Sequence, residues 1–284
     1  MKSIKFTMIL IAFLFMFQII FSDSVPGIGS ETEAGPIVIY GDTRSNYQIH
    51  QEVVAAIETF NPSVVFHSGD FIRLSSDMEK KWNKFLSITE NLRNNSEFLP
   101  VKGNHEMNNE FFTSTFRFME DHAWYSVDRN DIHFIVLDSN ADLTNGEEPS
   151  EQYTWLINDL ENIADDILFT IVLYHHPIFT TGPHPADEKN LGDILLPLFS
   201  EYGVDIVFNG HNHCYERSQY NGIYHIVTAG GGATLYDQMR YSKHSQLFLL
   251  ENHFCKLTIE NGQLIVEVIN LDFETIDQIV IDNE

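Results

Sequence analysis

The stretch that decides the fold of this chain is residues 204–217, which read VDIVFNGHNHCYER. Its first five residues are mostly β-branched or aromatic and predict a short buried strand. His211 and His213 follow the end of that strand. Residues two apart in an extended segment point to the same side, so both imidazoles can converge on one point. Neutral imidazole is the commonest protein ligand for transition-metal ions, and the spacing therefore favours a metal site.

Four other predicted strands are followed by polar residues that suit the same kind of site. The strands predicted at 36–40, 63–67, 98–101 and 167–174 precede Gly41-Asp42, Gly69-Asp70, Gly103-Asn104-His105-Glu106 and His175-His176-Pro177. A turn is the simpler interpretation of any one Gly-Asp pair. Recurrence at successive strand ends favours ligands, because glycine allows a sharp turn and carboxylate oxygens bind iron, manganese or zinc.

The segments between these strands have the apolar spacing of helices. Helices are predicted at 47–60, 77–91 and 147–163. Strand, helix and strand in this order indicate parallel strands joined by right-handed crossovers. Ligand groups in such sheets gather outside the carboxyl ends of the strands. Three further strands are predicted at 247–251, 254–260 and 263–270, with an Asn261-Gly262 hairpin, and we expect them to complete a second sheet.

The composition excludes whole classes of partner. The chain has 41 acidic and 16 basic side chains, for a formal net charge of -25. Such a charge works against binding nucleic acid or an anionic membrane. The two cysteines, Cys214 and Cys255, are too few for a disulfide framework and lack the spacing of a zinc ribbon. They can form one bridge or remain free.

The first residues of the chain resemble a targeting segment. Lys2 and Lys5 precede an apolar run at 6–21, and Ser22-Asp23-Ser24 follows it. This order predicts a cleaved secretory signal peptide at 1–24, since the run is short for a membrane span of about 20 residues. A retained N-terminal membrane anchor is the alternative. We expect a linker at 25–35, a single domain at 36–284, a secreted or extracytoplasmic protein and no membrane span after cleavage.

The five polar blocks, in this order, resemble those of the calcineurin-like metallophosphoesterases. The tail Tyr215-Glu216-Arg217 resembles more narrowly the relatives of purple acid phosphatases. The resemblance covers about residues 36 to 235. It implies an α/β fold, a four-layer α/β/β/α sandwich of two mixed sheets, with a two-metal site at one edge of the paired sheets.

The resemblance also implies a role for each polar block. The cofactors would be two divalent or mixed-valence transition-metal ions, iron, zinc or manganese. Asp42 and His213 would bind the first ion, Asp70 would bridge both, and Asn104, His175 and His211 would complete the second. His105 would contact phosphate and protonate the leaving group, and His184 would bind substrate. His176 would lie behind the ligands or be packed.

Two departures from the family pattern concern the first ion. Many members have a histidine where this chain has Arg44, and purple members have a tyrosine where it has Arg73. The first ion therefore has three protein ligands, and no purple colour is expected. Water, Tyr40, Asn46 or Tyr47 can fill the gap, or the ion is weakly held. Arg44 either contacts a phosphoryl oxygen of the substrate, or is an arginine that lies at the surface or behind the ligands.

These residues together predict a secreted phosphoesterase. Two neighbouring cations lower the pKa of a shared water from about 15.7 to about 7, which makes a hydroxide that can attack phosphorus. We expect a small phosphate monoester as substrate, with the oligomeric state left open. The alternatives are a phosphodiesterase or nucleotide hydrolase, and a metal-binding scaffold of the same fold that has lost turnover.

Overall fold

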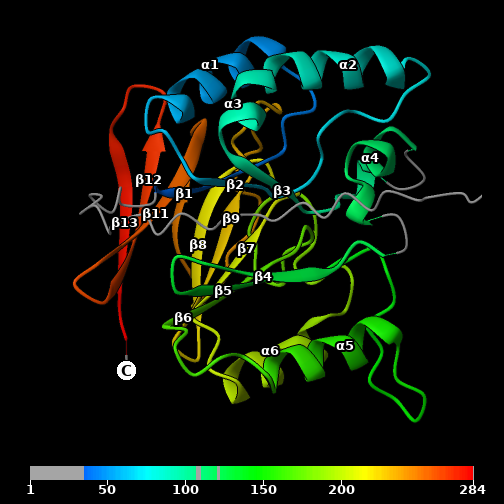
Figure 1. The fold of residues 1–284 in the computed structure, drawn as a ribbon, viewed down its shortest axis with the longest axis vertical. Coiled ribbons are helices and arrows are strands. Elements are labelled where there is room, and N and C mark those ends of the chain that lie inside the picture. Colours follow the sequence, from blue (N-terminus) through cyan, green and yellow to red (C-terminus); the bar gives the residue numbers. More distant parts are fainter. Residues whose placement is uncertain (1–34, 107–109, 120–121, 284) are drawn as a thin grey trace, which may run out of the picture. The chain divides into compact units, whose positions relative to one another are not determined.

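Two mixed β-sheets pack face to face between two groups of helices in the computed structural model of the chain (Figure 1). The structure describes residues 35–106, 110–119 and 122–283. The predicted signal peptide at 1–24, and all but the last residue of the predicted linker, lie outside these ranges. None of the helices within the described ranges combines the length and hydrophobicity that a membrane span requires.

The first sheet has six strands in the order β13-β12-β11-β1-β2-β3. Their bounds are β1 Ile37–Tyr40, β2 Val64–His67, β3 Glu97–Pro100, β11 His253–Glu260, β12 Gln263–Asn270 and β13 Thr275–Asp282. Strands β1, β2 and β3 are parallel, as predicted, and Tyr40, His67 and Pro100 are paired across them. The three strands therefore end level with one another, and the residues that follow them start from one edge.

The second sheet has seven strands in the order β10-β8-β9-β7-β6-β5-β4. Their bounds are β4 Tyr125–Arg129, β5 Ile132–Val136, β6 Phe169–Leu173, β7 Ile206–Asn209, β8 Tyr215–Tyr220, β9 Ile223–Thr228 and β10 Ser245–Leu249. Strands β5, β6, β7 and β9 are parallel. Strands β6 and β7 thus direct the histidine blocks that follow them to one edge of this sheet.

The prediction that the last strands complete the second sheet was wrong for β11 and β12. Strand β11 pairs with the free side of β1, with Ile37 opposite Leu257, and β12 and β13 follow it. This pairing satisfies the open edge of β1 and buries one face of each strand. Only β10 joins the second sheet. The hairpin at Asn261 and Gly262 is confirmed, with φ of 53° and 79°.

The described ranges contain six α-helices, five of which cover the outer faces of the sheets (Figure 1). The six helices are α1 Tyr47–Glu58, α2 Met78–Ile88, α3 Glu90–Asn95, α4 Glu110–Thr115, α5 Glu151–Leu160 and α6 Gly192–Glu201. Figure 1 shows α1, α2 and α3 over one sheet and α5 and α6 over the other. The helix predicted at 77–91 is interrupted at Thr89, whose hydroxyl donates to the carbonyl of Phe85. Asn46, one candidate ligand for the first ion, instead caps α1 by accepting from the amides of residues 48 and 49.

The main core lies between the two sheets. It includes Phe66 and Phe134 from opposite sheets, with ring centroids 4.6 Å apart. A second core packs α5 and α6 on the outer face of the seven-stranded sheet, and a third packs α1 on the outer face of the six-stranded one. Both cysteines are buried and free, so the possible disulfide between Cys214 and Cys255 is not formed.

Candidate metal centre

The candidate site lies where β1, β2 and β3 of one sheet and β6 and β7 of the other end at a common edge. The loops are joined by backbone hydrogen bonds within each sheet. The amide of Asp42 donates to the carbonyl of Gly69 at 3.0 Å, and the amide of Gly210 donates to the carbonyl of His175 at 3.0 Å. The amide of His211 also donates to Oδ2 of Asp42 at 3.0 Å, which links the two sheets.

Backbone conformation sets the direction of several side chains at this edge. Asp42, Asp70 and His211 have φ of 57°, 57° and 73°, in the left-handed region that side chains other than glycine rarely adopt. Such strain is typical of functional sites, where the surrounding structure holds it. A Cβ at Gly210 would lie 2.8 Å from the carbonyl oxygen of Ser68, so only glycine allows this close approach of the loops.

Four predicted ligands of the second ion converge on one point. Oδ1 of Asn104 lies 3.1 Å from Nε2 of His175 and 3.1 Å from Nδ1 of His211. Oδ1 of Asp70 lies 3.4 Å from Nε2 of His175. Asp70, His175 and His211 are buried, and Asn104 is partly buried. Two oxygens and two ring nitrogens thus face one another in a protected place, an arrangement that suits iron, manganese or zinc.

Fixed partners on the far sides of both rings decide which nitrogen faces this point. Nδ1 of His175 donates to the carbonyl of Ser68 at 2.8 Å, which leaves a lone pair on Nε2 of the neutral ring. Nε2 of His211 lies 3.2 Å from Oε1 of Glu188, a close contact without hydrogen-bond geometry, and the nearby carboxylate favours the proton on Nε2 and the lone pair on Nδ1. Ligand histidines commonly hold their other nitrogen in this way. The lone pairs therefore fit a cation between them.

The predicted ligands of the first ion form a second group. One atom each of Asp42, Asp70 and His213 lies within 4.8 Å of the others, and all three residues are buried. Nδ1 of His213 donates to the carbonyl of Thr234 at 2.7 Å, and its Nε2 lies 3.5 Å from Oδ1 of Asp42. Oδ1 of Asp42 and Oδ2 of Asp70 accept no hydrogen bond from the described residues. Buried carboxylate oxygens without a hydrogen bond are costly unless a cation lies beside them.

Burial and charge shift the pKa values of these groups strongly. Burial raises the pKa of Asp42 to about 8. Burial would also raise the pKa of Asp70, but His175, His105 and Arg44 outweigh it and hold that pKa below its ordinary value. Burial would lower the pKa of His175, but the two carboxylates raise it to about 9. The centre therefore attracts positive charge, which either protons or metal ions can supply.

Arg44 reaches into the centre beside the first group of ligands. Its side chain is 13% exposed, and its Nε lies 3.5 Å from Oδ2 of Asp70. Its Nη2 donates to Nε2 of His213 at 2.9 Å and to the hydroxyl of Tyr236 at 3.3 Å. Its Nη1 contacts Nε2 of His105. Arg44 is therefore an internal part of the site rather than a surface residue.

His105 and His184 lie at the open side of the centre. Nδ1 of His105 accepts the amide of Leu74 at 3.0 Å, and its Nε2 contacts Arg44 and lies 3.9 Å from Oδ2 of Asp70. His184 has a 38% exposed side chain, and its ring centroid lies 4.1 Å from that of His211. The structure thus brings every predicted site residue to one place, while their roles as ligands, acid and substrate contacts stay predictions.

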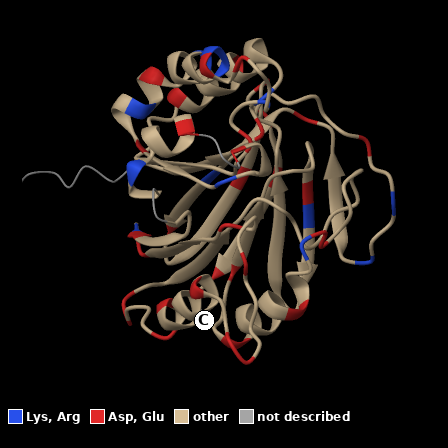
Figure 2. Ribbon diagram, turned by 90° about the vertical axis from the view of Figure 1, so that its right-hand side faces the viewer, with Lys and Arg blue, Asp and Glu red and all other residues tan. Residues whose placement is uncertain are grey.

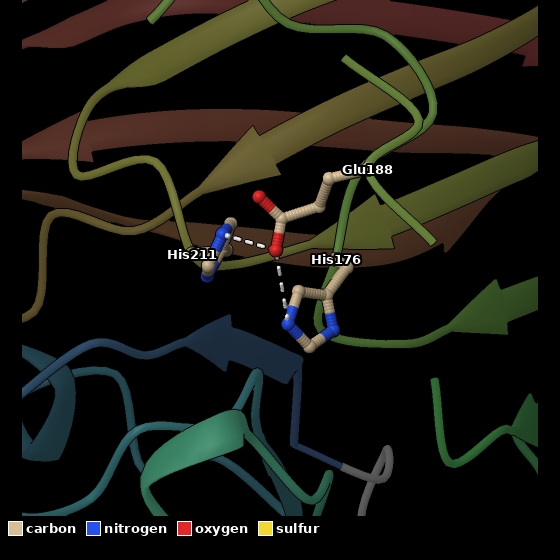
Figure 3. Close-up of side chains that lie close together, drawn as sticks. All are labelled: His176, Glu188 and His211. Atoms are coloured by element: carbon tan, nitrogen blue, oxygen red, sulfur yellow. Dashed lines mark ion pairs between the residues drawn. The ribbon is translucent and has the colours of Figure 1, made fainter. Parts of the chain in front are cut away.

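Glu188 is a member of the site that the sequence did not indicate. Figure 3 shows its carboxylate between His176 and His211, with Oε1 3.2 Å from Nε2 of His211 and 3.6 Å from Nε2 of His176. These three side chains could themselves hold an ion by distance. However, Nδ1 of His176 is hydrogen-bonded with the hydroxyl of Ser139 at 2.8 Å, so this ring is already held from its other side. Glu188 therefore fits best as the carboxylate that orients His211.

Glu106 and Tyr236 are two further members that were not assigned. Glu106, quoted in the third block without a role, accepts three backbone amides from Asp70, Phe71 and Gly103. The ring of Tyr236 stacks on that of His213 with centroids 4.0 Å apart. Tyr236 follows the glycines at 230–232, and nothing in its local sequence distinguishes it.

The comparisons with known proteins agree with this geometry. The family model described as calcineurin-like phosphoesterase matches residues 35–215. Purple acid phosphatase 15 of Arabidopsis thaliana is 29% identical over 177 residues, which are 54% of this chain and 33% of that protein. Purple acid phosphatase 1 of Ipomoea batatas is 37% identical over 113 residues, which are 38% of this chain and 23% of that protein. The matched part thus spans well under half the length of these relatives.

Solved structures show the same fold. The purple acid phosphatase PPD1 from yellow lupin (Lupinus luteus) superposes with a TM-score of 0.74 at 21% identity, over 87% of this chain and 53% of that chain. GAP50 of Plasmodium superposes with a TM-score of 0.69 at 17% identity, over 88% of this chain and 89% of that chain. With the family model matching more than half of its residues, this chain belongs to the calcineurin-like phosphoesterase family.

Proposed function

We propose that this protein hydrolyses small phosphate monoesters at a centre of two transition-metal ions. The observation that carries the proposal is the convergence of oxygen and nitrogen atoms from Asp70, Asn104, His175 and His211, with the outer ring nitrogen of His175 hydrogen-bonded and that of His211 close to Glu188. Ions bound at this centre would supply an activated water and neutralise charge on the phosphoryl oxygens. The purple acid phosphatases among the relatives support the choice of phosphate esters.

The protein's own residues have separate tasks in this proposal. His105, whose Nε2 lies beside Arg44 and 3.9 Å from Oδ2 of Asp70, would donate a proton to the leaving oxygen. Burial lowers the pKa of His105 and Asp70 opposes that effect. Arg44 and His184 would bind the phosphate group, since both border the ligands and carry donors. Glu188 would keep His211 in the correct tautomer.

The charge distribution supports a small substrate over a polyanion. Figure 2 shows acidic segments on the helices at the bottom of the view, α5 and α6, whose sequences contain no lysine or arginine. With a net charge of -25, a long phosphate backbone would meet repulsion beyond the site. A single phosphoryl group needs only the local cations. A phosphodiester or nucleotide substrate is the alternative within the same chemistry.

The test is a turnover assay with metal-loaded full-length protein. Aryl and alkyl phosphate monoesters and an aryl phosphodiester are compared at equal concentration. Asp70→Ala should abolish turnover, because Asp70 is shared by both groups of ligands. His105→Ala should lower the rate for alkyl leaving groups more than for aryl ones, because a poor leaving group needs the proton. Equal losses for both classes would reject His105 as the acid.

A metal-binding scaffold without turnover is the second candidate. The observation in its favour is Arg44, which contacts two of the predicted ligands of the first ion, Asp70 and His213. GAP50, described as the anchor in the inner membrane complex of Plasmodium, has a similar fold. Protein that retains metal after purification yet hydrolyses none of the test esters would support this candidate over the enzyme.

We also propose that the mature protein is secreted or extracytoplasmic. The support is the apolar run at 6–21 after two lysines, and an N-terminal membrane anchor is the alternative. N-terminal sequencing of protein expressed from the full chain distinguishes the two. Secretion predicts a mature N-terminus near residue 25 in the medium or periplasm. An uncut chain in the membrane fraction would support the anchor.

A further inference from the structure

The guanidinium of Arg44 lies against two of the three predicted ligands of the first ion. It is 3.5 Å from the Oδ2 atom of Asp70 and 2.9 Å from Nε2 of His213. A guanidinium carries one positive charge and five N–H donors, and it is always charged in proteins. Arg44 therefore already provides these acidic and imidazole ligands with a cation.

The contact with His213 makes the two cations mutually exclusive. Nδ1 of His213 donates to the carbonyl of Thr234 at 2.7 Å, so Nε2 has the single lone pair of the neutral ring. That lone pair accepts the N–H of Arg44. One lone pair can bind a metal ion or a hydrogen-bond donor, but not both.

Three of the four predicted ligands of the second ion are free of this competition, and only the shared Asp70 contacts Arg44. Within the described part of the chain, the hydrogen bonds and ion pairs of Arg44 end on Asp70, His105, His213 and Tyr236, and none ends on Asn104, His175 or His211. The side chain of Arg44 is 13% exposed, so part of it reaches solvent. An ion that enters the first position must therefore displace the guanidinium from His213, whereas an ion that enters the second position displaces no such contact from Asn104, His175 or His211.

We propose that Arg44 is an internal competitor for the first metal ion, so that the two positions fill in sequence. The position at Asn104, His175 and His211 fills first, and the position at Asp42 and His213 fills only when the ion concentration is high enough to displace the guanidinium. The displaced guanidinium then faces the open side, where it can bind a phosphoryl oxygen. This inference rests on the proposed metal centre and adds a dependence of loading on free metal.

The experiment measures binding and not turnover. Full-length protein is freed of metal with a chelator and titrated with Mn²⁺, and free Mn²⁺ is followed by its electron paramagnetic resonance signal. The wild type should show one tight and one weak ion per chain. Arg44→Ala should tighten the weak ion at least tenfold and leave the tight one within threefold. Arg44→Gln, which keeps polar bulk without the charge, should shift the weak ion in the same direction.

Arg73→Ala is the matched control. Arg73 is exposed, and its charge acts on His105, yet it makes no contact with the predicted ligands among the described residues. This variant should bind both ions as the wild type does. Two ions of equal affinity in the wild type, or a weak ion unchanged in both Arg44 variants, would overturn the competition while leaving the metal centre intact. Absence of any bound Mn²⁺ would overturn the proposed function as well.

Discussion

Glu106→Gln is the substitution that tests how the loops of the centre are held. Glu106 is 1% exposed, and its carboxylate accepts three backbone amides. Oε2 accepts from Asp70 at 2.9 Å and from Gly103 at 3.1 Å, and Oε1 accepts from Phe71 at 3.0 Å. Burial raises the pKa of Glu106, and these amides oppose that rise. The side chain therefore ties the loop after β2 to the loop after β3.

The expected loss in the free energy of unfolding follows from the number of backbone N–H donors that lose their acceptor. Glutamine can place its oxygen where two amides meet, but its NH₂ group then faces the amide of Phe71. One buried N–H without a partner costs about 1–3 kcal/mol, and weakening the two remaining bonds adds about 1 kcal/mol. We expect a loss of about 3 kcal/mol in the free energy of unfolding. For a chain of this size that lowers the melting temperature by roughly 6–12 °C.

The assay is thermal and urea unfolding of the full-length protein, followed by circular dichroism. Glu110→Gln is the control, because it makes the same chemical change at an exposed residue at the start of α4. It should change the free energy of unfolding by about 0.5 kcal/mol or less. A Glu106→Gln variant as stable as this control would refute the argument, since the three amides would then need no acceptor. A loss confined to Mn²⁺ affinity would show that only the centre, and not the fold, depends on Glu106.

Three further predictions concern the core, the pH dependence and the metal. Phe85→Ala should lower the free energy of unfolding by about 3–5 kcal/mol, because Phe85 is 1% exposed. Phe118 is 55% exposed, so Phe118→Ala should lower it by about 1 kcal/mol or less in the same urea titration. His133 lies between Asp128 at 2.5 Å and Asp159 at 3.0 Å, and although burial opposes it these carboxylates raise its pKa above 6.5. A histidine whose pKa is raised by folding contributes its full stabilisation below its pKa in the unfolded chain, and this stabilisation is lost as the pH rises through its pKa in the folded chain. The free energy of unfolding of the wild type, relative to that of His133→Gln, should therefore be greatest below about pH 6 and should decline as the pH rises. A flat difference across urea titrations from pH 5 to 9 would contradict this. Mn²⁺ at 100 times its dissociation constant should raise the free energy of unfolding by about 2.7 kcal/mol, and a chelator should reverse this gain. An unchanged melting temperature on adding Mn²⁺ would argue against an ion bound by the folded state.

The sequence alone was sufficient for the features that depend on neighbouring residues. Apolar runs identified β1, β2, β3, β6 and β7, and the polar blocks directly after them contained all the predicted ligands. Such blocks are readable because a strand and the turn after it are local, and parallel strands place their ends at one edge. The Asn261-Gly262 hairpin was readable for the same reason, since a two-residue turn specifies its own backbone conformation.

Only the tertiary structure decided what depends on contacts between distant segments. Alternating hydrophobic residues show that β11 and β12 have a buried face, but not that the free edge was that of β1. The contacts of Glu188 and Glu106 are with residues in other loops, so their roles cannot be recognised from the sequence around them. The carbonyls of Ser68 and Thr234 also fix which ring nitrogens of His175 and His213 face the centre. The position of Arg44 among the ligands is likewise set by the meeting of the two sheets. The sequence determines which chemical group each residue carries, whereas packing fixes the direction of its lone pairs and the position of its charge.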